Sequence, residues 1–236
     1  PYLVEVSEKE AIDIDNLSDY NLSKKLINFS ENEKNNIFDL IYLNNLPTEK
    51  LKKKIKHISF DLDGVLIDSY SLMNKSWNFS MKKNKLNYRF SEYKKYIGLP
   101  FRDILKNMGI DKKYWLPIDK EYNYFSINHS NFIKPYKNIK RLLKNLIKRK
   151  FKISIITSKN YERTNEILHK YFNNIKFSIV ITPDDVKIGR GKPFPDSLYL
   201  ACLKTGVSLD QTIFIGDMYS DYLFAKNCKV NFIHAK

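Results

Sequence analysis

The first residues with chemical potential are Asp61 and Asp63, two carboxylates in the segment Phe60-Asp61-Leu62-Asp63-Gly64. The preceding run, Ile55 to Phe60, is short and apolar enough to be a buried strand, and Gly64 ends it. Both carboxylates should emerge at the carboxyl end of that strand, where open α/β sheets bind ligands. One carboxylate can attack phosphorus while the other transfers protons. A solvated loop pair or a capping aspartate is the alternative for this segment alone.

Two further segments carry groups that suit an anionic ligand. Ile153 to Ile156 runs into Thr157, Ser158 and a lysine, with a helical pattern after them. Thr157 and the backbone N–H groups that follow can hold a phosphate at a helix start, although a plain helix N-cap is the alternative. Lys192 lies in Gly191-Lys192-Pro193, a stiff loop from which it can neutralise two neighbouring anions.

A second transition from strand to acid occurs at Thr212 to Asp221, where Asp217 follows the apolar strand and Asp221 comes four residues later. The two acids would lie one helical turn apart if a helix begins near Met218. Capping of that helix by acidic residues is the alternative reading. Four such segments in this order are improbable by chance.

Taken together, the four segments resemble the motifs of the haloacid dehalogenase-like (HAD) hydrolase superfamily over about residues 55 to 236. The match is closest to the phosphoglycolate phosphatase and β-phosphoglucomutase branch, through Gly-Lys-Pro-x-Pro-Asp at residues 191–196 and Gly-Asp-x-x-x-Asp at residues 216–221. The resemblance implies a nucleophile, Asp61, and a general acid/base, Asp63. It also implies phosphate contacts from Thr157, Ser158 and Lys192, and a Mg²⁺ site formed by Asp61, Asp63, Asp217 and Asp221.

The chemistry agrees with these roles, because a carboxylate that approaches a dianionic phosphate must overcome charge repulsion. Mg²⁺ accepts hard oxygen ligands and, with Lys192, would offset that repulsion. Asp63 discriminates within the superfamily, since a halide leaving group needs no proton. The dehalogenase and phosphonatase branches of the family lack this second acid. By this resemblance, Asp63 favours phosphate-ester hydrolysis or phosphoryl transfer.

The expected fold is α/β: a doubly wound, Rossmann-like parallel sheet with an inserted helical cap. Strands alternate with helices from Ile139 onward, which calls for a parallel sheet with right-handed crossovers. The predicted elements are helix 139–150, strand 151–157, helix 162–172, strand 177–181, helix 197–205 and strand 212–216.

Between Ser69 and Pro135 the pattern changes to helix-like stretches, which indicates a cap over the strand ends. The expected division is a core of residues 55–69 and 135–236 and a cap of residues 70–134. Gly98 to Leu105 resembles the glycine-containing cap loop of the branch, which makes Arg102 a candidate substrate contact. An ordinary arginine on a surface helix is the alternative.

Residues 1–54 are expected to form a helical extension. The stretch Glu8 to Tyr20 resembles the carboxyl-terminal tail of acylneuraminate-type cytidylyltransferases without their catalytic half, which suggests fusion to, or association with, such an enzyme. The chain begins with Pro1 rather than Met, which fits a segment of a longer fusion protein, although maturation is the alternative. If residues 1–54 are such a tail, the reading frame should extend upstream. A helical extension that simply packs on the core is the alternative.

Composition adds weaker constraints. Two cysteines suggest reduced thiols and a cytoplasmic protein, and no apolar run is long enough to cross a membrane. The net charge of +15, with 16 Tyr and 15 Phe, raises a nucleic-acid-binding module as the rival from another class, but no nucleic-acid motif is present. The expected function is therefore a phosphatase acting on a small phosphorylated substrate, a sugar phosphate, and a phosphosugar mutase is the nearer alternative.

Overall fold

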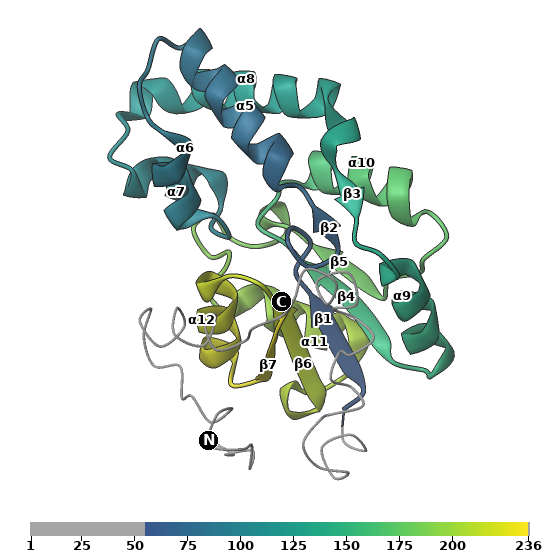
Figure 1. The fold of residues 1–236 in the computed structure, drawn as a ribbon. Coiled ribbons are helices and arrows are strands. Elements are labelled where there is room, and N and C mark those ends of the chain that lie inside the picture. Colours follow the sequence, from purple (N-terminus) through teal and green to yellow (C-terminus); the bar gives the residue numbers. More distant parts are fainter. Residues whose placement is uncertain (1–54, 236) are drawn as a thin grey trace, which may run out of the picture.

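The computed structural model describes residues 55–235, in which a helical cap lies above the carboxyl edge of a five-stranded sheet (Figure 1). Neighbouring strands are all parallel and follow the order β5-β4-β1-β6-β7, which confirms the predicted doubly wound sheet. The strands are β1 (His57–Phe60), β4 (Lys152–Ile156), β5 (Ile179–Ile181), β6 (Thr212–Gly216) and β7 (Asn231–His234). The expectations for residues 1–54 lie outside the described residues.

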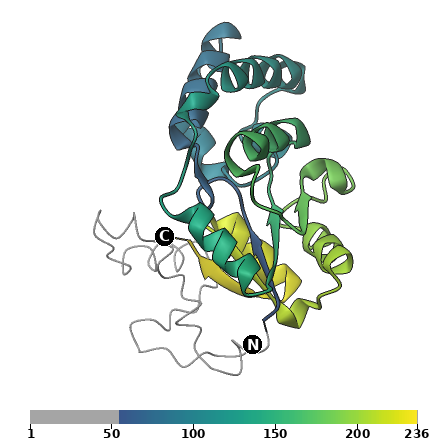
Figure 2. The same cartoon turned by 90° about the vertical axis from the view of Figure 1, so that its right-hand side faces the viewer.

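The helices of the core cover both faces of the sheet. They are α9 (Ile139–Lys148), α10 (Tyr161–Phe172), α11 (Asp196–Thr205) and α12 (Tyr219–Cys228). Alternation along the strands explains the two layers, because successive side chains point to opposite faces. Ile153 and Ile155 of β4 pack in one cluster with α9 and α10, whereas Ile156 packs with α11 and α12. Figure 2 shows the helices on either side of the sheet below the cap.

Strand β1 lies at the centre, and its register sets the position of the site. Phe60 pairs with Ile155 of β4 and with Ile215 of β6. The backbone N–H of Asp61 donates to the Ile215 carbonyl at 2.8 Å, so the ladder continues one residue past the strand. The segments that follow β1, β4 and β6 therefore leave the sheet side by side at its carboxyl edge.

A buried polar row crosses the opposite half of the three central strands. His57 Nε2 lies 2.8 Å from Ser154 Oγ, its Nδ1 lies 3.2 Å from Thr212 Oγ1, and Ser154 Oγ donates to Ser59 Oγ at 2.9 Å. All four side chains are fully buried, so these hydrogen bonds avoid the cost of unsatisfied polar groups. Burial lowers the pKa of His57 to about 4, which keeps the imidazole neutral inside the fold.

The cap has its own apolar core and joins the sheet through a short ribbon. Its helices are α5 (Tyr70–Lys83), α6 (Phe90–Tyr93), α7 (Phe101–Asn107) and α8 (Trp115–Asn128), with 3-10 turns at Lys94–Tyr96, Lys112–Tyr114 and Ser130–Phe132. Trp77 is fully buried in this core, and its Nε1 donates to the Tyr88 carbonyl at 2.8 Å. Strands β2 (Ile67–Asp68) and β3 (Lys134–Pro135) pair antiparallel where the chain enters and leaves the cap, a feature the sequence patterns did not predict.

Element positions differ from the predicted ones by a few residues at the ends. Strand β5 starts at Ile179 rather than at residue 177, and α9 ends at Lys148 rather than at residue 150. Two short 3-10 turns, Pro183–Asp185 and Leu209–Gln211, precede α11 and β6. Between residues 55 and 235, no helix combines the length and the apolar character that crossing a membrane requires.

Candidate active site

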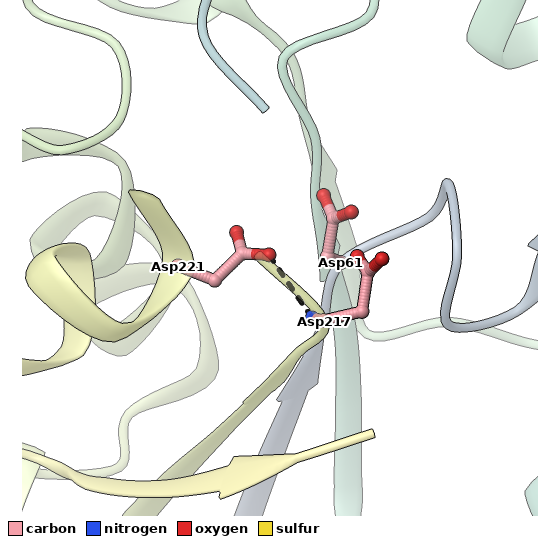
Figure 3. A group of neighbouring side chains, drawn as sticks. All are labelled: Asp61, Asp217 and Asp221. Atoms are coloured by element: carbon pink, nitrogen blue, oxygen red, sulfur yellow. Dashed lines mark hydrogen bonds between the residues drawn. The ribbon is translucent and has the colours of Figure 1, made fainter. Parts of the chain in front are cut away.

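Three carboxylates, from Asp61, Asp217 and Asp221, converge beyond the ends of β1 and β6 (Figure 3). Each offers an oxygen, and these atoms lie within 4.8 Å of one another. All three side chains are buried, with Asp221 wholly inaccessible. Because the penalty for an ion without a counter-charge is several kcal/mol in a protein interior, this cluster requires nearby positive charge.

Asp221 is held by the segment that carries Asp217. Its Oδ2 accepts hydrogen bonds from the backbone N–H groups of Asp217 and Met218, at 3.2 and 3.1 Å, at the start of α12. The chain folds back closely between Gly216 and Asp221, since a Cβ on Gly216 would overlap the side chain of Asp221. The spacing Gly-Asp-x-x-x-Asp therefore places both acids in one site and also caps the helix, so the two readings of this motif are compatible.

Lys192 supplies the positive charge. Its Nζ lies 2.6 Å from Asp61 Oδ1 and 2.6 Å from Asp221 Oδ1, and the residue is 3% exposed. Burial lowers the pKa of this amine, but the Asp221 and Asp61 carboxylates raise it more, and the net pKa lies above its ordinary value. The lysine is therefore charged at neutral pH and bridges Asp61, which follows β1, and Asp221, which lies in the first turn of α12.

Asp61 remains short of positive charge despite this contact. Burial raises its pKa to about 7, while Lys192 lowers it and the neighbouring Asp221 and Asp63 raise it further. A divalent cation would favour the ionised form that nucleophilic attack needs. The donor set of Asp61, Asp217 and Asp221 consists of hard carboxylate oxygens, which suit Mg²⁺, so the residues present fit the predicted metal.

Asp63 lies outside the three-carboxylate cluster and has separate partners. Its Oδ1 accepts a hydrogen bond from Ser69 Oγ, and its Oδ2 lies 3.2 Å from Lys159 Nζ. The Asp63 side chain is 15% exposed, so it borders solvent more closely than Asp61 does. The arrangement separates the predicted proton donor from the metal-binding oxygens, and a side-chain metal contact from Asp63 stays a prediction.

The predicted phosphate contacts lie at the end of β4, next to β1. Thr157 is 4% exposed, and its Oγ1 accepts from the Lys159 N–H at 3.1 Å, which leaves its hydroxyl proton for a ligand. Ser158 Oγ instead donates to the carbonyl of Gly98 in the cap, at 2.6 Å.

Arg102 is exposed on α7 of the cap. Burial raises the pKa of Asp119, and the nearby charge of Arg102 lowers that pKa by a smaller amount. A substrate contact for Arg102 stays a prediction.

Two residues next to the site, Lys159 and Ser69, were not among the predicted site residues. Lys159 follows the Thr157-Ser158 pair directly, and this position was the signal that could have identified it. Ser69 occurs six residues after Asp63. The sequence pattern gave no signal that the chain would turn back and bring Ser69 to Asp63. Both contact the predicted acid/base, so they hold its side chain in position.

Comparison with known proteins identifies the family of the chain. Residues 58–235 match the family model described as haloacid dehalogenase-like hydrolase. The chain is 28% identical over 177 residues to pyrophosphatase PpaX of Oceanobacillus iheyensis, which covers 75% of this chain and 81% of that protein. It is 30% identical over 175 residues to pyrophosphatase PpaX of Anoxybacillus flavithermus, with 73% and 80% covered.

Solved structures show the same fold. A hydrolase from Pseudomonas syringae is similar with a TM-score of 0.67 at 25% identity, over 76% of this chain and 84% of that one. A haloacid dehalogenase-like family hydrolase from Streptococcus pneumoniae reaches a TM-score of 0.65 at 17% identity, over 77% and 85%. The predicted family and the prediction of a hydrolase are thus confirmed, and the chain belongs to the haloacid dehalogenase-like hydrolase family.

Proposed function

We propose that this protein is a Mg²⁺-dependent phosphatase that hydrolyses a small phosphate monoester, with sugar phosphates as the substrate class. The observation that carries the proposal is the contact between Asp61 and Lys192, at 2.6 Å, inside the cluster completed by Asp217 and Asp221. A buried carboxylate beside a fixed cation is the arrangement that a nucleophile for a dianionic phosphate requires.

In the first step, an oxygen of Asp61 forms a bond to phosphorus and the bond from phosphorus to the ester oxygen breaks. The departing alkoxide takes a proton from Asp63. In the second step, Asp63 removes a proton from water, the resulting hydroxide attacks phosphorus, and the bond to Asp61 breaks with release of phosphate. When bound, Mg²⁺ supplies positive charge that offsets the repulsion between Asp61 and the phosphate.

The other residues hold the groups that react. Lys192 neutralises Asp61 and Asp221 from one side, and the Thr157 hydroxyl can donate to a phosphate oxygen at the end of the adjacent strand. Lys159 Nζ lies 3.2 Å from Asp63 Oδ2, and this contact would hold the acid/base in place. The cap, which lies above this edge of the sheet, would exclude water and contact the leaving group (Figure 1).

Pyrophosphate is a second candidate substrate, because both of the curated relatives described above are named pyrophosphatases. The same two steps apply to it, with phosphate rather than an alkoxide as the leaving group. A phosphate dianion is a far weaker base than an alkoxide, so hydrolysis of pyrophosphate depends less on a proton from Asp63.

The experiment is a phosphate-release screen with Mg²⁺ over sugar phosphates, nonulosonate 9-phosphates, phosphoglycolate and pyrophosphate. We expect turnover of at least one sugar phosphate in the parent protein and none in Asp61→Asn, a change that keeps the side-chain volume but removes the nucleophile. Circular dichroism and thermal melting would show that Asp61→Asn stays folded. Mg²⁺-dependent turnover by pure Asp61→Asn would overturn the mechanism, and turnover of pyrophosphate alone would replace the substrate class.

A further inference from the structure

The turn that joins the first 3-10 segment of the cap to α7, residues 97–100, is here called the cap loop. It touches the core at three places. Ser158 Oγ donates to the Gly98 carbonyl at 2.6 Å. Gly98 approaches the start of α12 so closely that an added Cβ would overlap Ser220 Oγ and lie 3.3 Å from Met218 Cβ. Pro100 lies against Gly191, since a Cβ added to Gly191 would be 3.2 Å from the Cγ of Pro100.

Each of these core contacts is adjacent in sequence to a residue of the active site. Ser158 follows Thr157, and Gly191 precedes Lys192. Met218 and Ser220 lie between the acids Asp217 and Asp221. The cap loop therefore rests on the three segments that carry the phosphate contact, the bridging lysine and the carboxylates of the metal cluster.

Ser158 is the polar member of this set that bonds across the boundary between core and cap. A serine hydroxyl has one proton to donate, and here it is directed to the Gly98 carbonyl. While this bond is in place, the hydroxyl has no proton to offer a phosphate oxygen. Gly98 also has φ of +100°, a conformation that residues with a Cβ rarely adopt, so both its backbone and its contact with Ser220 require glycine.

We propose that Ser158 is a positioning residue whose hydroxyl holds the cap loop over the active site through the Gly98 carbonyl and does not contact the phosphate. This inference rests on the proposed function and adds to it the means by which the cap is seated. Loss of one neutral hydrogen bond should lower the equilibrium constant for seating the loop about tenfold. The phosphate-binding groups Thr157 and Lys192 would be untouched.

The test compares Ser158→Ala, Ser158→Thr and Gly98→Ala with the full chain. Hydrogen exchange, followed by mass spectrometry on peptides that cover residues 94–103, reports loop seating without reference to turnover. The Leu99 N–H, which donates to the Tyr96 carbonyl at 3.2 Å, lies within those peptides. Ser91→Ala, at an exposed serine of α6, is the matched control.

We expect about tenfold faster exchange in Ser158→Ala and at least as much in Gly98→Ala, with recovery in Ser158→Thr, which keeps the hydroxyl. The inhibition constant of inorganic phosphate, measured against p-nitrophenyl phosphate, should stay within twofold in Ser158→Ala, while kcat/KM for a sugar phosphate falls. Unchanged exchange, or phosphate inhibition weakened more than threefold, would overturn the proposal. If the parent protein lacks phosphatase activity, the function proposal fails while the exchange result still decides the role of Ser158.

Discussion

Removing the charge of Lys192 should destabilise the folded protein as well as abolish its activity. The variant Lys192→Met keeps a flexible side chain of similar length but removes both 2.6 Å contacts to Asp61 and Asp221. Two buried carboxylates then face each other without a counter-charge. Breaking a buried ion pair in this way costs about 3–5 kcal/mol. For a domain of this size, 1 kcal/mol corresponds to about 2–4 °C, so the melting temperature should fall by about 6–20 °C.

The pH dependence follows from the sign of the Asp61 shift. Its pKa is raised in the folded protein, and loss of Lys192 removes the main influence that lowers it. A carboxyl group whose pKa is higher in the folded than in the unfolded protein contributes stability at low pH, where the group is protonated. That contribution is lost as the pH rises through the folded pKa. The penalty in Lys192→Met should therefore be larger at pH 8 than at pH 5.

Thermal melting in EDTA is the appropriate assay, because a divalent cation would replace the missing charge. We expect Mg²⁺ to restore part of the stability of Lys192→Met, and the double variant Lys192→Met/Asp221→Asn to be more stable than the single one. Lys148→Met, at an exposed position of α9, is the control and should melt as the parent does. The reasoning is refuted if Lys192→Met melts within 2 °C of the parent and the double variant gains nothing.

Three other predictions follow from the site and from the buried polar row. Asp63→Asn should reduce turnover of alkyl phosphates by about 10²–10⁴-fold and that of p-nitrophenyl phosphate much less; equal losses would argue against Asp63 as the acid. Removal of divalent ions with EDTA should abolish turnover, and Mg²⁺ should restore it; full activity in EDTA would contradict the metal site. Burial lowers the pKa of His57 to about 4. The free energy of unfolding should therefore decrease by up to about 3 kcal/mol as the pH falls from 6.5 to 4, because the unfolded chain binds the proton first. Urea unfolding at both pH values should show a smaller loss for His57→Gln, and an identical loss would exclude this origin.

The order and type of the secondary structure were predictable because they depend on local patterns. Short apolar runs such as Thr212 to Gly216 become buried strands, and the alternation of strands with helices permits a parallel sheet with right-handed crossovers. The same local signals placed Asp61 and Asp217 after strands. Since parallel strands end at one edge, their meeting there also followed from the sequence.

The partners of the side chains at that edge were decided by the tertiary structure. Lys192 reaches Asp61 across 131 positions of sequence, and no local period records that its amine would lie between Asp61 and Asp221. The pairing of Lys159 with Asp63 likewise depends on β4 lying beside β1. The seat of the cap loop on Ser158 depends on how two separately packed apolar cores meet. Local sequence determines where the strands end and which chemical groups stand there, whereas the packing of distant segments determines which of those groups touch.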